Sequence, residues 1–288
     1  MTLKSVLQED VALEPARPAG SDRAYVTLVT SDGYATGATG LVRSLVLSGT
    51  GADIVVLHTD GAPQSSLAPL AAMGARLVRT DLLPTSNAFN RAHARDVLHR
   101  VAPFDKGNKP PLHTPLDNFT KLRLWQLTEY AACVFIDADA MVLQNIDELF
   151  DYPEFRAAPN VYEGWGDFHR LNSGVFTARP DTATFRRMLE KLDRPGVFWR
   201  RTDQTFLEHY FPQWHGLPIT YNMLQYVWFN IPELWDWRSV KLLHYQYEKP
   251  WQDPHPKAEL LAPLIRLWHA YAEGGSIPSY EELGEPAA

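Results

Sequence analysis

The chain has 288 residues, a net charge of −7 and 45% hydrophobic residues, which is typical of a soluble globular protein. The acidic balance, without any cluster of Lys and Arg, argues against a nucleic-acid partner. The single cysteine, Cys133, excludes an internal disulfide and is typical of a reducing compartment. No apolar run is as long as a membrane span, and the first ten residues contain no apolar signal core. We therefore expect a cytoplasmic protein.

The first part of the chain predicts an α/β domain. Residues 1–23 show no hydrophobic periodicity and are expected to form a flexible extension before a single domain of residues 24–288. The predicted elements are a strand at 24–30, a turn at 31–40 leading into a helix at 41–47, a strand at 53–58, a helix at 63–73 and a strand at 76–79. This alternation indicates a Rossmann-like α/β/α fold with a mostly parallel central sheet, which binds ligands beyond the carboxyl ends of its strands.

Three glycines follow the first strand, but they do not form a dinucleotide-binding loop. Gly33, Gly37 and Gly40 lack the G-x-G-x-x-G spacing of such loops. We interpret them instead as residues of a tight turn and of close helix packing.

The segment 82–118 is long and irregular. It contains five prolines and a short helical patch at 91–99, a pattern typical of a functional loop, a lid or a partly disordered segment. Its histidines, His93, His99 and His113, show no ligand spacing and are expected to lie on the surface.

The remainder of the chain adds further strands and helices. The predicted elements are an amphipathic helix at 119–130, a strand at 133–136, a capped turn or short helix at 145–150, strands at 155–158 and 171–177, helices at 185–192 and 200–209, strands at 218–222 and 240–245, and a terminal helix at 260–272. The Trp-rich segment 228–237 is expected to be core or interface rather than a sugar-binding platform.

Two aspartates directly follow a strand of apolar residues. Asp137 and Asp139 end the run that begins at Cys133, and an unpaired buried carboxylate is costly. Side chains two residues apart in an extended chain share a face, so both carboxylates can bind one hard divalent cation, with room for a ligand over the small Ala138. A solvated strand end or a helix cap is the alternative interpretation. Hydrophobic residues on both sides of the pair favour the metal site.

Further motifs follow in a fixed order along the chain. They comprise residues 25–30 with Tyr34, 120–122, 135–139 with 145–147, 172–176, 203–204, 221–222, and His244 with 249–251. Each motif is weak alone, but the ordered set resembles glycosyltransferase family 8, the family of glycogenin and galactinol synthase. The resemblance implies a GT-A fold and a retaining transfer of a hexose, glucose or galactose, from a UDP-sugar to a small polyol, sugar or glycan.

The resemblance also implies roles for single residues. Asp137, Asp139 and His244 would hold a Mn²⁺ ion that bridges the two phosphates, with Mg²⁺ as the alternative, because an imidazole ligand suits Mn²⁺ better. The implied donor-binding residues are Thr27, Leu28, Thr30, Ser31, Tyr34, Lys121, Ala138, Asn172, Gln204 and Lys249. The implied catalytic residues are Asp203, Gln204 and Lys121. We favour a front-face transfer in which the leaving phosphate accepts the proton of the acceptor, while Asp203 and Gln204 position the sugar.

Each of these residues has an ordinary explanation when it is considered alone. Lys121 would be a surface lysine, His244 a core histidine, Asp203 a helix N-cap, and residues 172–174 a turn. The metal and donor roles therefore depend on the whole set of motifs.

Three features depart from the family pattern. The family often has the motif H-x-x-G-x-x-K. Here only four residues, none of them glycine, separate His244 from Lys249, so the segment is shorter and we expect the phosphate loop to close differently. Arg200 and Arg201 stand where glycogenin often has an acid, a change that bears on sugar choice. Residues 229–231 contain no tyrosine, so self-glucosylation is not expected.

Other functional classes remain to be weighed. A non-catalytic UDP-sugar-binding or scaffold protein of the same fold is the main alternative, and the intact metal set argues against it. A nucleotide-sugar pyrophosphatase or nucleotidyltransferase needs a basic, glycine-rich loop after the first strand, but residues 31–34 contain no Lys or Arg. We expect residues 82–118 to shape the acceptor site. The sequence leaves the sugar, the acceptor and homodimer formation open.

Overall fold

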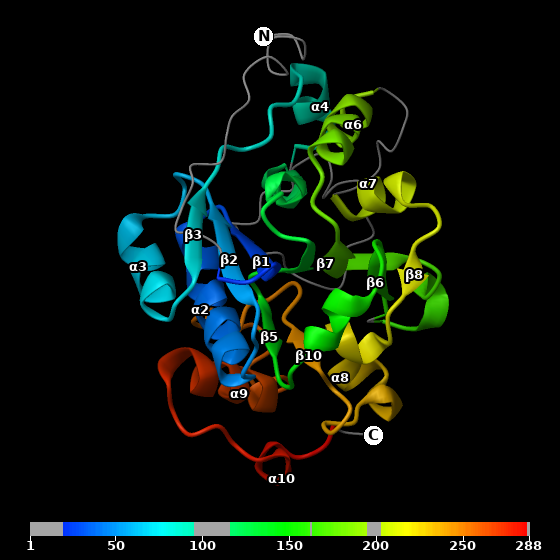
Figure 1. Cartoon of the computed structure of the whole chain (residues 1–288). Coiled ribbons are helices and arrows are strands. Elements are labelled where there is room, and N and C mark those ends of the chain that lie inside the picture. Colours follow the sequence, from blue (N-terminus) through cyan, green and yellow to red (C-terminus); the bar gives the residue numbers. More distant parts are fainter. Residues whose placement is uncertain (1–19, 95–115, 162, 195–202, 287–288) are drawn as a thin grey trace.

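The computed structural model describes residues 20–94, 116–161, 163–194 and 203–286. It has three layers, with a central sheet between two layers of helices (Figure 1). The sheet has seven strands in the order β3-β2-β1-β4-β7-β6-β8. Their bounds are β1 (Arg23–Val29), β2 (Asp53–His58), β3 (Arg76–Arg79), β4 (Ala132–Ile136), β6 (Arg156–Pro159), β7 (Leu171–Ala178) and β8 (His215–Gly216). Strands β3, β2, β1 and β4 are parallel and β7 is antiparallel to β4, which confirms the mostly parallel α/β sheet.

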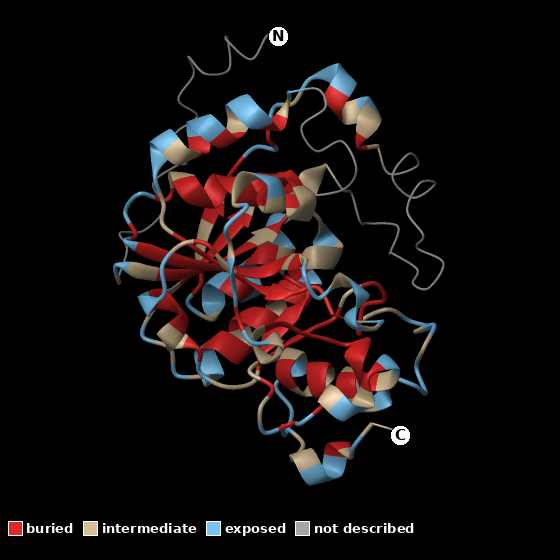
Figure 2. Ribbon diagram, turned by 90° about the vertical axis from the view of Figure 1, so that its right-hand side faces the viewer, coloured by how far each residue is buried: buried red, intermediate tan, exposed pale blue. Residues whose placement is uncertain are grey.

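Helices cover both faces of this sheet (Figure 2). The central strands β1, β4 and β7 are almost entirely buried, whereas the edge strands β3 and β8 are partly or fully exposed. Helices α2 (Asp32–Leu47) and α3 (Gln64–Ala72) contribute to the apolar core on one face. The 3₁₀ helix η1 (Asp117–Gln126) and helices α6 (Thr182–Leu192) and α7 (Asp203–Tyr210) contribute to the core on the other. The predicted extension at residues 1–23 lies outside the described residues except for residues 20–23.

A second, small sheet lies beside the first. Its strands β5 (Ala140–Val142), β10 (Leu242–His244) and β9 (Met223–Leu224) share a third apolar core with helix α9 (Ala262–Glu273). The remaining elements are α4 (Asn87–Ala92), η2 (Asp147–Asp151), η3 (Trp165–Asp167), η4 (Ile219–Asn222), α8 (Val227–Asn230), η5 (Pro232–Leu234) and α10 (Tyr280–Leu283). Trp228, Trp235 and Trp237 are buried in this third core, which confirms their predicted core role. None of the helices in the described part of the chain is long and apolar enough to cross a membrane.

The turn predicted at 31–40 is wrong, because helix α2 begins there. Ser31 is its N-cap and accepts a hydrogen bond from the Tyr34 backbone N–H at 3.5 Å. The packing role of the glycines is confirmed at Gly37. A Cβ atom at that position would lie 2.5 Å from the Trp251 ring and 2.8 Å from the Ala138 carbonyl oxygen, closer than side chains approach each other. The helix therefore needs a glycine where it crosses the turn that follows β4.

Two other element predictions are wrong. The amphipathic helix predicted at 119–130 is the 3₁₀ helix η1, and all residues from Phe119 to Trp125 are buried. Its polar residues are satisfied inside the protein; for example, Arg123 Nε donates to the Asp81 carbonyl oxygen at 2.6 Å. The strand predicted at 218–222 is mostly the 3₁₀ helix η4, and the chain becomes extended only at Met223.

His93 is a core residue rather than the predicted surface histidine. It follows α4, is fully buried, and its ring stacks on Phe89 with centroids 3.9 Å apart. Of the helical patch predicted at 91–99, residues 91 and 92 form the end of α4, residues 93 and 94 are not helical, and residues 95–99 lie outside the described residues. His99 and His113 lie outside the described residues.

Burial lowers the pKa of His93, so the unfolded chain binds this proton more tightly than the folded protein does. The free energy of unfolding is therefore expected to fall as the pH drops through the ordinary imidazole pKa of about 6.5. Urea unfolding at several pH values should show a weaker pH dependence in His93→Leu than in the wild type. The control His169→Leu removes an exposed ring and should keep the wild-type dependence. Equal slopes in all three proteins would contradict this assignment.

Candidate functional site

The two predicted aspartates and the predicted histidine meet where the two sheets join. Asp137 and Asp139 lie in the turn from β4 to β5, closed by a hydrogen bond from Ala140 N to the Asp137 carbonyl oxygen at 3.0 Å. Strand β10 pairs antiparallel with β5 and places His244 opposite Ala140. One ligand atom from each of Asp137, Asp139 and His244 lies within 4.8 Å of the other two. We call these three residues the metal cluster.

The metal cluster fits a divalent cation. Two carboxylates and one imidazole form a mixed oxygen and nitrogen donor set, which suits Mn²⁺ and similar ions. The side chain of Asp139 is only 10% exposed, whereas that of Asp137 is 30% exposed, so the cluster opens to solvent at Asp137. Among the described residues, no other group of three such side chains lies so close together.

Lys121 links the metal cluster to Asp203. Its Nζ lies 3.0 Å from Asp137 Oδ1 and 2.7 Å from Asp203 Oδ2, and the residue is only 2% exposed. Ser173 Oγ also donates to Asp203 Oδ2, at 2.7 Å. Burial alone would lower the pKa of Lys121, but the two carboxylates outweigh burial and raise that pKa above its ordinary value. Lys121 is thus a buried cation, and the Asp203 carboxylate is engaged by Lys121 and Ser173.

Lys249 reaches the metal cluster from the other side. Its Nζ forms an ion pair with Asp139 Oδ2 and donates to the Tyr245 carbonyl oxygen at 2.8 Å. The segment lacks the family's glycine, and Tyr247, which stands at that position, has a φ of 65°. Left-handed backbone favours glycine, so Tyr247 adopts the conformation that the glycine would otherwise supply. The altered loop still brings Lys249 beside the aspartates.

The two aspartates have opposite electrostatic environments. Burial, followed by the charge of Asp139, outweighs the attraction of Lys121 and raises the pKa of Asp137. Burial alone would also raise the pKa of Asp139, but Lys249 and His244 hold it well below its ordinary value. Asp139 is therefore firmly ionised, whereas Asp137 gains most from an added cation.

The residues predicted to frame the nucleotide lie at the carboxyl end of β1. Burial, followed by the charges of Asp139 and Asp137, raises the pKa of Tyr34 well above its ordinary value. Thr27 is buried, and its Oγ1 has no hydrogen-bond partner among the described residues. Thr30 and Ser31 connect β1 to α2, while Leu28 packs against the core on the side of η1.

The other predicted residues are arranged around the same point. Ala138 separates the two aspartates, and Gln204 follows Asp203 in the first turn of α7. Asn172 lies in β7, and its side chain bonds to Asn160, Asn222 and the Gly174 backbone. Sequence reasoning gave no role to Ser173, Gly174 or Asn222. The only sequence signal for these three residues is that they lie in the motifs 172–176 and 221–222, because their contacts depend on the tertiary fold.

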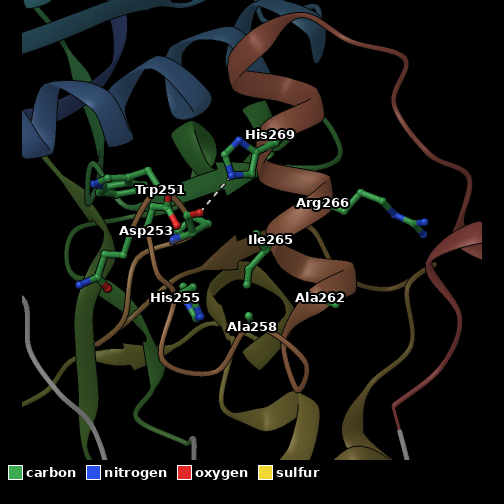
Figure 3. Close-up of a pocket in the computed structure, with 10 residues that line it drawn as sticks. Trp251, Asp253, His255, Ala258, Ala262, Ile265, Arg266 and His269 are labelled. Atoms are coloured by element: carbon green, nitrogen blue, oxygen red, sulfur yellow. Dashed lines mark hydrogen bonds between the residues drawn. The ribbon is translucent and has the colours of Figure 1, made fainter.

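A separate pocket of about 520 Å³ lies between the loop after Lys249 and helix α9 (Figure 3). Pro250, Trp251, Asp253 and His255 are among the residues that line it from the loop, facing Ile265, Arg266 and His269 on α9. His269 Nε2 lies 3.1 Å from the Pro250 carbonyl oxygen. None of the residues predicted to bind metal or donor lines this pocket, so it is distinct from the metal cluster.

Comparison with known proteins places the chain in a family. No family model matches it. It is similar to human glycogenin-1, with 34% identity over 250 residues that make up 83% of this chain and 65% of that protein. It is also similar to UDP-glucuronate:xylan alpha-glucuronosyltransferase 2 of Arabidopsis thaliana, with 32% identity over 251 residues, 84% of this chain and 37% of that protein. The chain thus spans only part of these curated relatives.

Solved structures agree on the fold. The bifunctional glycosyltransferase WbbM superposes with a TM-score of 0.62 at 18% identity, covering 94% of this chain and 52% of that one. The galactosyltransferase LgtC, solved with donor and acceptor sugar analogues, superposes with a TM-score of 0.58 at 14% identity, covering 89% of this chain and 98% of that one. The fold is GT-A, and the chain belongs to glycosyltransferase family 8.

Proposed function

We propose that the chain transfers a hexose from a UDP-sugar to a hydroxyl acceptor with retention of anomeric configuration, using Mn²⁺. The observation that carries this proposal is the metal cluster, in which Asp137, Asp139 and His244 lie within 4.8 Å of one another. Lys121, paired with Asp203, lies beside that cluster and adds a second charged group to the site. The family membership supports a UDP-sugar as the donor.

The residues of the site suit the departure of a diphosphate. When bound, the cation supplies charge that stabilises the negative charge developing on the leaving phosphates. Lys249 and Lys121 flank the metal cluster on its two sides, so the chain adds two buried ammonium groups to the same region. Buried charges interact more strongly than charges in water, so these groups orient the donor before reaction.

The contacts of Asp203 support a front-face transfer. Lys121 and Ser173 both bond to its Oδ2 at 2.7 Å, which stabilises the carboxylate and makes it a weaker nucleophile. We propose that the leaving phosphate accepts the proton of the acceptor hydroxyl. Asp203 and Gln204 then position the hexose and stabilise the positive charge that develops on it.

We further propose an external acceptor, namely a small polyol, sugar or glycan. The tyrosine nearest to segment 229–231 is Tyr226, which is 1% exposed and donates its hydroxyl hydrogen to Glu248 Oε2 at 2.7 Å. A hydroxyl group that is buried and hydrogen-bonded in this way is a poor acceptor of a hexose transferred by the active site of the same chain. Residues 82–118, which lie partly outside the described residues, are proposed to shape the acceptor site. An unchanged acceptor KM after their deletion would contradict that assignment.

Calorimetry with nucleotide sugars tests the proposal directly. UDP-glucose, UDP-galactose, UDP-N-acetylglucosamine and UDP-glucuronate are titrated with and without Mn²⁺ or Mg²⁺. We expect tight, Mn²⁺-dependent binding of UDP-glucose or UDP-galactose, followed by release of UDP when an acceptor panel is added. The product anomer, read by proton NMR, should match the donor. Binding without any turnover would favour the non-catalytic alternative, and no binding of any UDP-sugar would overturn the proposal.

A further inference from the structure

We propose that Asn222 and Asn172 are positioning residues that fix the tautomer of His244, so that the lone pair of Nε2 points at the two aspartates. This inference deepens the proposed function, because it assumes that His244 is a ligand of the cation. It assigns a task to Asn222 and a second task to Asn172, whose donor-binding role is implied by the family resemblance. Neither residue would touch the cation itself.

The backbone N–H of Gly174 fixes the orientation of the Asn172 side-chain amide. The Gly174 N–H can only donate, and it donates to Asn172 Oδ1 at 2.9 Å. That contact identifies this atom of Asn172 as the oxygen rather than the nitrogen of its amide. The Asn222 atom that lies 2.8 Å from the same oxygen must then be the donor, Nδ2. The amide orientation of Asn222 is therefore set by the backbone of β7.

The orientation of Asn222 in turn sets the proton on the imidazole. With Nδ2 turned to Asn172, the Asn222 oxygen Oδ1 lies 2.9 Å from His244 Nδ1. Because Oδ1 can only accept, Nδ1 must carry the hydrogen. A neutral ring that is protonated at Nδ1 has its lone pair on Nε2, which is the form that binds a metal.

The other side of the ring agrees with this assignment. His244 Nε2 lies 3.3 Å from Asp139 Oδ1. When Nε2 has no hydrogen, both atoms are acceptors, and a cation between them makes their proximity favourable. A second-sphere group that accepts from the other ring nitrogen is the usual partner of a metal-binding histidine. In this protein the accepting group is the side-chain amide oxygen of Asn222.

Packing holds the ring in the same position. A Cβ atom at residue 174 would lie 2.4 Å from His244 Cε1 and 2.6 Å from its Nδ1, so Gly174 allows the ring to lie directly against β7. Asn222 is fully buried, and Asn172 Nδ2 donates to Asn160 Oδ1 at 2.9 Å. The ring is thus fixed by contact with β7 and by a hydrogen-bonded series that ends on backbone.

Metal affinity provides the first test. The variant Asn222→Leu keeps a similar volume but removes the acceptor, and we expect its Mn²⁺ affinity to fall about 10- to 100-fold. The variant Asn222→Asp still accepts from Nδ1–H but cannot donate to Asn172 Oδ1, so its Mn²⁺ affinity should lie between those of the wild type and Asn222→Leu. The control Asn87→Leu changes an exposed residue of α4 and should have no effect. Free Mn²⁺ is counted by electron paramagnetic resonance, without any sugar donor.

The tautomer itself provides the second test, on the unaltered protein. Nitrogen-15 NMR of the histidine-labelled, metal-free chain distinguishes the two neutral tautomers, and the His244 signals are assigned by their loss in His244→Gln. Spectra are recorded at rising pH until the ring is neutral. We expect hydrogen on Nδ1 in the wild type and a shift towards Nε2 in Asn222→Leu.

The two tests separate this inference from the proposed function. Hydrogen on Nε2 in the wild type, or equal Mn²⁺ affinity in Asn222→Leu and the wild type, would overturn the inference even if UDP-sugar turnover is found. The Nδ1 tautomer together with the expected loss of affinity would support it even if no UDP-sugar is bound. In that case only the proposed function would fall.

Discussion

Replacing Asp139 by asparagine is expected to lower Mn²⁺-dependent turnover of the UDP-sugar by roughly 10²- to 10³-fold. The change removes one of the two anionic groups of the metal cluster and leaves the size of the side chain nearly unchanged. Asp139 is also the carboxylate whose pKa Lys249 and His244 hold well below its ordinary value, so it is ionised at any working pH. The turnover number at saturating donor is the quantity to measure, together with the Mn²⁺ affinity.

The same substitution should destabilise the fold, which has to be separated from its effect on turnover. Lys249 is 3% exposed and would lose its carboxylate partner, at a cost of about 3–5 kcal/mol in the free energy of unfolding. The double variant Asp139→Asn with Lys249→Met removes the unpaired charge and should recover most of that stability without recovering turnover. Asp151→Asn, which breaks an exposed ion pair with Arg23, is the matched control and should behave like the wild type. Near-normal turnover in a folded Asp139→Asn protein would contradict the assignment of Asp139 as a metal ligand.

Replacing Lys121 by methionine is expected to lower the free energy of unfolding by about 3–5 kcal/mol as well. Methionine matches the length of the lysine stem but leaves the Asp203 carboxylate, which is 3% exposed, with Ser173 as its one remaining partner among the residues that the structure describes. Asp137 would lose the same cation, and its pKa, already raised by burial, would rise further. Urea unfolding followed by circular dichroism measures the change.

A second substitution identifies the cause of that loss. In Lys121→Met with Asp203→Asn, the most buried of the unpaired charges is gone, so part of the lost stability should return. Lys191→Met removes an exposed lysine of α6 and should change stability little. If the double variant is no more stable than Lys121→Met, the ion pair between Lys121 and Asp203 is not the source of the effect.

Elements with a clear local pattern could be predicted from the sequence. The strands at 53–58 and 76–79 have the predicted bounds because β-branched residues there lie between turn-forming residues. Helix α2 was predicted to begin too late because Gly33, Gly37 and Gly40 have low helix propensity. What allows a helix there is tertiary contact, since the turn after β4 approaches α2 at Gly37. This contact between α2 and the turn after β4 cannot be predicted from the residues of α2 alone.

The same distinction applies to the site. Asp137 and Asp139 could be identified from two carboxylates directly after an apolar strand. His244 could not be found in this way, because its position depends on the pairing of β10 with β5, and only the family resemblance pointed to it. His93 was misplaced for a related reason. A histidine between two alanines, with an arginine beyond each of them, gives no local sign that Phe89 and Phe119 will enclose it.

The junction of the two sheets also has a consequence for the synthesis of the protein. The aspartates belong to the turn after β4, whereas His244 and Lys249 come from a segment about a hundred residues later in the sequence. On the ribosome, a nascent chain that has exposed only β1 to β4 therefore carries both aspartates and Lys121, but neither the imidazole of His244 nor the ammonium group of Lys249. The metal cluster and its two lysines can therefore come together only after residue 249 has emerged and β10 has paired with β5.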